Sequence, residues 1–328
     1  MRPKIITKVA FAVLIIVCCI TGTGCAPTKA FVRTSPSYGQ VATQISNLGI
    51  INDVVLARDL IGTNDYFCIE DSKSAANFML RAATAHLMQK GYRVEFANTP
   101  FIGAFKNPDL RMEVAAKHKD AINKLYSPFF VSEQAVQDEA YQEALKHIFR
   151  RVLMAVEQKG DSPTEVFRRD PSVRESLTTI AQRTKADFVL FAIGNGTVVS
   201  KGKQIGQDIA SGLLTGILSL GTMVHTAHSV SYLDSFVALV DLRNPEILWS
   251  NSFRLRELNP LKERTYLGAW SKCLLYHFPP QRVGESEKKA KAPQDAKRVC
   301  AVTSTRAQAN RWEPEPIPQL QNYPHRQR

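Results

Sequence analysis

The segment spanning residues 186–253 constrains the fold of this chain more than any other. It opens with ADFVLFAI at 186–193, an apolar run with the length of one strand, and this run follows helix-like residues 172–184. A strand that is apolar along its length has no polar face to turn to water, so it is expected to be covered on both sides. The segment therefore predicts a buried strand of an α/β sheet that is flanked by helices.

The end of the same segment predicts a β-hairpin. FVALVDL and EILWSNSF are rich in β-branched, aliphatic and aromatic residues, and Arg-Asn-Pro separates them at 243–245. Asn-Pro is a turn former, and the flanking residues suit a pleated surface. We expect Leu190, Val240 and Trp249 to be largely buried in the core that this hairpin helps to form.

The upstream sequence predicts a strand–helix–strand unit. LGIINDVVLA at 48–57 is typical of a strand, and Ser72 is a suitable N-cap for a helix that ends at Lys90, before Gly91. YRVEF at 92–96 alternates between polar and apolar residues and predicts a second strand. This order is the crossover of an α/β sheet.

Two further regions have helical patterns. Residues 106–160 are expected to form a helical insertion, with one helix over 109–125 and another that starts at Ser132. After the hairpin, large apolar residues within 261–278 recur at helical spacing and predict a closing helix against the sheet.

The middle of the chain resembles a known family. The motifs ADFVL (186–190), LVDL (239–242) and ILWS (247–250) resemble those of periplasmic lipoproteins that include the curli-secretion protein CsgG, the Pel-polysaccharide protein PelC and the TolB amino-terminal domain. Pro245-Glu246 stands where that group usually has Gly before Ile-Leu-Trp. The resemblance covers about 48–278, and it implies an α/β fold with a mixed sheet flanked by helices more closely than it implies a function.

The amino terminus is typical of a bacterial lipoprotein signal. A basic stretch, MRPKIITK, precedes a twelve-residue apolar run that ends before small residues and Cys25. Such a run matches a signal-peptide core and is too short to span a bilayer. We predict that residues 1–24 are removed and that Cys25 is lipidated, although Gly22 stands where a lipobox usually has Leu. The residue after Cys25 is Ala26 and not Asp, which resembles the signal for outer-membrane rather than inner-membrane sorting. The alternative is ordinary signal-peptide cleavage that leaves Cys25 unmodified.

The composition predicts the remaining organisation. Residues 25–47 mix Pro, Thr, Ser and Gly and are expected to be a tether, and 48–280 form the periplasmic domain. Residues 281–328 are rich in Lys, Pro, Gln and Ala and predict a disordered basic tail. The net charge of +12 is concentrated in part at the termini, and no nucleic-acid-binding motif accompanies it. A membrane surface is therefore a more suitable partner than nucleic acid.

A glycine-rich insert at 205–228 interrupts the central segment, and residues 209–224 within it carry no charge. Small residues four apart allow close helix approach. Three interpretations stay open: a helix packed over the sheet, a contact with a second copy or an envelope partner, and a segment that meets lipid. The residues of the expected contact are Gly212, Leu213, Gly216, Ile217 and Leu220.

No serine, cysteine or carboxylate lies in a catalytic motif, so we predict a protein that is not an enzyme and needs no cofactor. His225 and His228 lack an evident third metal ligand, and we predict no metal site. By elimination, Cys273 and Cys300 are the candidate disulfide pair. The sequence favours an anchored structural component of an envelope assembly or export system, in which the glycine-rich insert mediates self-association or docking to an envelope partner. The alternatives are a binding module for a peptide or glycan, and a hydrolase with a nonstandard site.

Overall fold

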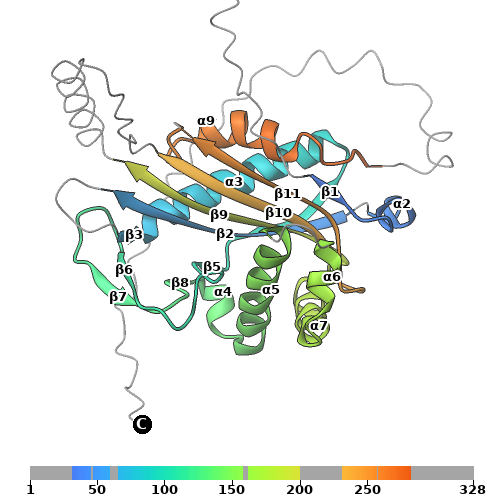
Figure 1. The fold of residues 1–328 in the computed structure, drawn as a ribbon, viewed down its shortest axis with the longest axis horizontal. Coiled ribbons are helices and arrows are strands. Elements are labelled where there is room, and N and C mark those ends of the chain that lie inside the picture. Colours follow the sequence, from blue (N-terminus) through green and yellow to red (C-terminus); the bar gives the residue numbers. More distant parts are fainter. Residues whose placement is uncertain are drawn as a thin grey trace, which may run out of the picture. The chain divides into compact units, whose positions relative to one another are not determined.

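A mixed β-sheet of nine strands lies at the centre of the part of the chain that the computed structural model describes (Figure 1). That part comprises residues 32–45, 47–59, 66–157, 162–199, 231–256 and 258–281. In spatial order the strands are β1 (Arg33–Thr34), β11 (Glu246–Arg256), β10 (Tyr232–Asp241), β9 (Phe188–Val199), β2 (Asn47–Asp59), β3 (Tyr66–Cys68), β6 (Met112–Ala115) and β7 (Asn123–Leu125). The ninth strand, β4 (Arg93–Asn98), pairs with β2.

The four longest strands form the centre of this sheet. β2 and β9 are parallel, whereas β9, β10 and β11 are successively antiparallel. The apolar run at 186–193 enters β9, and the predicted hairpin is formed by β10 and β11. Leu190, Val240 and Trp249 are each fully buried, as expected. The α/β fold class is therefore confirmed.

Helices cover both faces of the sheet (Figure 1). One face is covered by α3 (Ile69–Gln89). The side chain of Asn52 on β2 donates a hydrogen bond of 2.7 Å to the Ala76 carbonyl of this helix. On the other face, α5 (Glu139–Glu157) packs Phe149 edge-on against Phe191 of β9, with 5.6 Å between the ring centroids. Helices α6 (Pro163–Arg168) and α7 (Ser172–Thr184) accompany α5. The central strands can be apolar along their length because both faces are covered.

The strand–helix–strand unit is present, but its helix starts earlier than predicted. α3 begins at Ile69, and Ser72 lies inside its first turn rather than at the N-cap. The Ser72 hydroxyl donates to the Cys68 carbonyl (2.7 Å) and accepts from the Leu56 amide of β2 (2.9 Å). Ser72 thus joins the helix to the sheet. Gly91 follows the helix with a φ of 95°, as a C-terminal glycine should.

The helix predicted over 109–125 is wrong. This region contains β6 and β7, which form an antiparallel ribbon with Met112 opposite Leu125. The long helix predicted from Ser132 is present in two parts, α4 (Glu133–Val136) and α5. The side chain of Asp138 accepts the Tyr141 amide (3.0 Å) and so begins a new helix after α4. A short separate sheet of β5 (Phe101–Ile102) and β8 (Phe130–Val131) lies in the same region.

The closing helix is formed by α9 (Glu263–Thr265) and η1 (Tyr266–Leu275), a segment with the wide turn of a π-helix. Tyr266, Trp270, Leu274 and Phe278 are all buried, as their spacing predicts. The indole nitrogen of Trp270 donates to the Ser235 hydroxyl of β10 (3.0 Å), which fixes this segment to the same face as α3.

Part of the predicted tether is folded. β1 pairs antiparallel with β11, with Arg33 opposite Ser250, and α2 (Tyr38–Val41) follows it. Ala42 and Ile45 are fully buried in the core. Apolar side chains in a segment of mixed composition were sufficient to attach it to the sheet edge.

Candidate functional site

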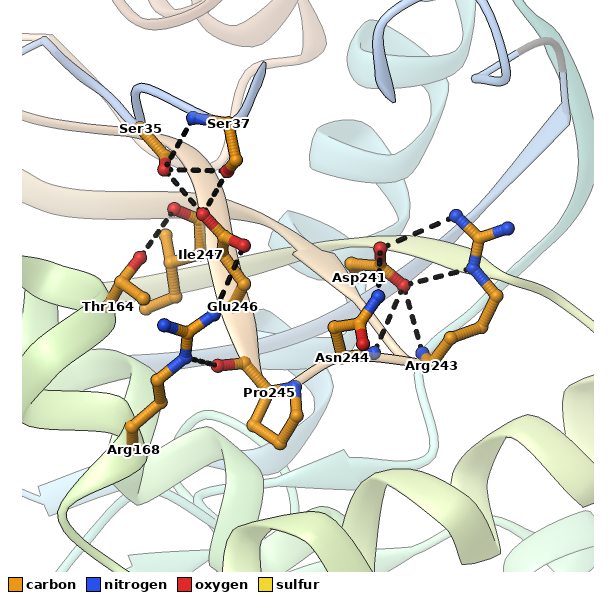
Figure 2. Close-up of polar contacts among 10 residues, drawn as sticks. All are labelled: Ser35, Ser37, Thr164, Arg168, Asp241, Arg243, Asn244, Pro245, Glu246 and Ile247. Carbon is orange, nitrogen blue, oxygen red and sulfur yellow. Dashed lines mark hydrogen bonds and ion pairs between the residues drawn. The ribbon is translucent and has the colours of Figure 1, made fainter. Parts of the chain in front are cut away.

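The turn of the β10–β11 hairpin assembles a polar site, shown in Figure 2. Asp241, the last residue of β10, is almost fully buried. Its carboxylate accepts the backbone amide of Arg243 (2.9 Å) and of Asn244 (3.4 Å), and it also accepts the Arg243 guanidinium (3.2 Å from Nε). An aspartate that binds amides of the following residues stabilises a turn. Asp241 therefore holds the turn that the Arg-Asn-Pro sequence predicts.

Arg243 connects the turn to the start of β9. Its guanidinium lies 4.6 Å from the centroid of the Phe188 ring and 3.6 Å from the Asp187 carboxylate. It also donates to the side chain of Gln44 (3.4 Å). The fold thus brings together two of the sequence motifs, ADFVL and LVDL, at one end of the sheet.

The side chain of Glu246, the first residue of β11, binds residues from two segments that are distant in the sequence. One carboxylate oxygen accepts the hydroxyls of Ser35 (2.5 Å) and Ser37, which follow β1. The other accepts the Arg168 guanidinium of α6 (3.2 Å), which also donates to the Pro245 carbonyl (2.9 Å). Figure 2 shows the amino-terminal segment and α6 meeting at this one carboxylate.

A shallow depression of about 260 Å³ lies beside this turn. Thr164 of α6 donates to the Ile247 carbonyl (3.1 Å) and fixes the helix near it. Guanidinium and amide donors dominate the lining, so the depression suits polar contact with an acidic or hydroxyl-bearing group. Its lining residues are Arg168, Asp170, Pro171, Arg174, Asn244 and Pro245.

A serine–histidine–aspartate chain lies next to the depression. His147 of α5 contacts Asp170 through Nε2 (3.0 Å) and Ser176 of α7 through Nδ1 (2.9 Å). Hydrogen bonds from Ser172 and His147 lower the pKa of Asp170 to about 2. Ser176 lies within α7, and neither it nor His147 lines the depression. A catalytic serine needs access to substrate and an oxyanion site. We therefore interpret these hydrogen bonds as a link between α5 and α7.

A second polar cluster lies farther along the sheet. Asp53 of β2 is fully buried, and its carboxylate accepts the amides of Gly103 (2.7 Å) and Phe105 (3.3 Å). Burial raises the pKa of Asp53 to about 7, although these amides and the charge of Lys106 act in the opposite direction. Lys106 donates to the side chain of Asn195 on β9 (2.8 Å), and burial lowers its pKa.

Sequence reasoning missed this cluster, although one signal was present. Asp53 is an acid inside LGIINDVVLA, which is otherwise suited to a buried strand. A carboxylate in such a position requires hydrogen-bond partners. The identity of those partners, an amide loop some 50 residues away, has no local signature.

Most of the site residues predicted from sequence lie outside the described residues. Cys273 is within η1 and partly exposed, but its predicted disulfide partner Cys300 lies outside that range. His225 and His228 also lie outside it. The same holds for the lipidation residue and the insert contact: Cys25, Gly212, Leu213, Gly216, Ile217 and Leu220.

Neither a metal centre nor a membrane-spanning helix is found in the described ranges of the chain. Within those ranges, no group of three or more His, Cys, Asp or Glu residues is arranged to hold a metal ion. Among the same residues, no helix combines the length and apolar character that crossing a membrane requires.

No protein-family model and no curated protein matches the sequence. Among solved structures, the PelC dodecamer from Paraburkholderia phytofirmans is similar over 75% of this chain and 98% of its own, with 7% identity and a TM-score of 0.29. A single-substitution variant of that dodecamer in another space group covers 78% and 99%, with 9% identity and a TM-score of 0.26. The LpoB C-terminal domain from Salmonella enterica covers 63% and 81%, with 14% identity and a TM-score of 0.20. These likenesses are too distant to carry function.

Proposed function

We propose that this protein is an outer-membrane-anchored periplasmic lipoprotein and a structural component of a cell-envelope assembly or export system. The observation that supports the anchor is the order of basic residues, apolar run, small residues and Cys25 at the amino terminus. Lipid on Cys25, together with the basic charge of the chain, supplies membrane affinity.

The distance between Cys25 and the sheet supports a domain held close to the membrane. β1 begins at Arg33, eight residues after Cys25. Eight extended residues reach at most about 29 Å. The hydrogen bonds from Ser35 and Ser37 to Glu246 then attach this segment to the hairpin. A lipid on Cys25 would thus hold the start of β1 within that distance of the bilayer surface.

The role that we propose is non-catalytic. The carboxylates of the hairpin site, buried Asp241 and half-buried Glu246, are occupied by hydrogen bonds that hold the turn, β1 and α6. The Asp170–His147–Ser176 chain joins two helices. Side chains that make these hydrogen bonds stabilise the fold. We therefore propose that the protein acts through its surface, by binding other proteins.

The alternative is a periplasmic binding module for a partner peptide or glycan. The observation in its favour is the depression beside the turn, where Arg168, Arg174 and Asn244 present hydrogen-bond donors. At about 260 Å³ it accommodates one side chain or one sugar unit rather than an enclosed ligand.

The anchor is tested with Cys25→Ser in the full chain. Wild-type protein should carry lipid on Cys25 by mass spectrometry of the mature amino terminus and should fractionate with the outer membrane. The variant should be recovered soluble or uncleaved, because it lacks the lipid attachment site. An unmodified Cys25 in the mature wild-type protein would contradict the proposal.

The assembly role is tested by purifying the detergent-solubilised protein from membranes and identifying what accompanies it. A defined set of envelope proteins that disappears with Cys25→Ser supports a structural component. Retention of a soluble peptide or a glycan, lost on Arg174→Ala, supports the binding module instead.

A further inference from the structure

β4 leaves one of its edges open. It pairs with β2 in parallel on one side, and no described residue pairs with its other side. An open edge presents unpaired amides and carbonyls that a further strand can bind. β4 is six residues long and contains no proline. An edge of this length can serve as a template for strand addition, although β4 has an irregularity at Glu95.

The charges on β4 distinguish it from the other open edges. Arg93 and Glu95 are both exposed, have opposite signs and form no ion pair with any described residue. β1 and β7 are only two and three residues long. On the part of β11 beyond β1, Arg254 is already ion-paired with Asp234 of β10.

Arg93 and Glu95 make β4 complementary to itself. If a second β4 lies antiparallel with Val94 opposite Val94, Arg93 of each copy stands opposite Glu95 of the other. Both pairs join opposite charges, which stabilises cross-strand contacts. Glu95 has no partner on β2, because the register shifts between Val94 and Phe96. Its side chain is exposed.

A groove of about 420 Å³ is lined in part by residues of β4. An ion pair of 2.5 Å between Asp138 and Arg183 lies in its wall. The groove is lined from β4, α4, α5 and α7 by Glu95, Phe96, Asn98, Gln134, Asp138, Tyr141, Arg183 and Thr184.

We propose that two copies of this chain associate through β4, antiparallel, about a two-fold axis at Val94. The sheet then continues from one subunit into the next, and the contact is isologous, the commonest symmetry of protein dimers. This surface is separate from the glycine-rich insert, and the association does not require lipid on Cys25.

The first test is a charge exchange in the full-length protein, with the molar mass measured by light scattering in detergent. Glu95→Lys and Arg93→Glu should each reduce the dimer fraction at least tenfold, because each places like charges opposite one another. Arg93→Glu combined with Glu95→Arg should restore the dimer. Lys124→Glu, an exposed change on β7, is the matched control and should leave the mass unchanged.

The second test is a symmetric disulfide. Val94→Cys should form a covalent dimer under mild oxidation, because residue 94 faces its own copy, whereas Ala97→Cys should not exceed the wild-type background of the native cysteines. A monomeric wild type, equal cross-linking at 94 and 97, or a dimer insensitive to Glu95→Lys would overturn the inference. Mass spectrometry of Cys25 on the same samples separates this outcome from a failure of the proposed anchor.

Discussion

Asp53 is a residue whose ionisation the fold changes strongly. Its carboxylate is fully buried on β2, and burial raises its pKa from 3.8 to about 7 against the effect of the bound amides. The folded state therefore binds more protons than the unfolded state between about pH 4 and pH 7. Stability must fall as pH rises through that window and level off above it. A shift of this size corresponds to at most ~4 kcal/mol.

Asp53→Asn should remove this pH dependence. The asparagine does not titrate, and its amide nitrogen would face the Gly103 or Phe105 amide, so the variant should be less stable throughout. Urea unfolding at pH 5 and pH 8 gives the free energy of unfolding for both proteins. The difference between wild type and variant should be larger at pH 5. An equal difference at the two pH values would show that Asp53 is ionised throughout.

Among the elements, β4 packs closely against β2 because Gly49 of β2 has no side chain. A Cβ atom at Gly49 would lie 2.0 Å from the ring of Phe96. The ring therefore occupies the space that any other residue at position 49 would fill. Because β4 contacts the sheet only through β2, this one contact controls how β4 lies.

Gly49→Ala should destabilise the protein by ~1–3 kcal/mol, because the added methyl group overlaps the Phe96 ring. Equilibrium urea unfolding measures the change. Gly39→Ala is the control, since a Cβ there meets nothing within 4 Å. In a Phe96→Ala background the Gly49→Ala substitution should cost little, as a double-mutant cycle would show. Additive effects of the two changes would mean that the ring and the methyl group do not compete.

For the protein as a whole, the sequence predicts that the glycine-rich insert takes part in assembly. It joins β9 to β10, the central antiparallel pair, and its uncharged run contains several leucines and isoleucines. Each such side chain left in water forgoes roughly 1.5–3 kcal/mol. We therefore propose that the insert is covered by a second copy or an envelope partner.

Gly216→Leu adds bulk at this proposed contact without removing apolar area. Assembly size by light scattering should fall, and partners that co-purify from membranes should be lost. Arg93→Glu with Glu95→Arg provides the comparison, because it preserves charge complementarity on a different surface. Unchanged size and unchanged partners in the Gly216→Leu protein would reduce the insert to a local packing element.

The central strands of the fold could be predicted from local sequence patterns. The apolar run of β9, the β10–β11 hairpin and the helix before them follow from periodicity and turn chemistry among neighbouring residues. α7 spans Ser172–Thr184, the same residues that the sequence indicates. These elements were predictable because adjacent residues along the chain set both their conformation and their burial.

Tertiary structure decided what local pattern could not. The local pattern of residues 109–125 suggested a helix. The antiparallel pairing of Met112 with Leu125 shows that this region contains a two-stranded ribbon instead. Glu246 follows a predictable turn, but its partners Ser35 and Arg168 are 211 and 78 residues away. The partners of a strand edge or of a buried carboxylate are residues that folding brings close to it. That proximity has no periodic trace in the sequence, because it arises only when the sheet and its helices pack.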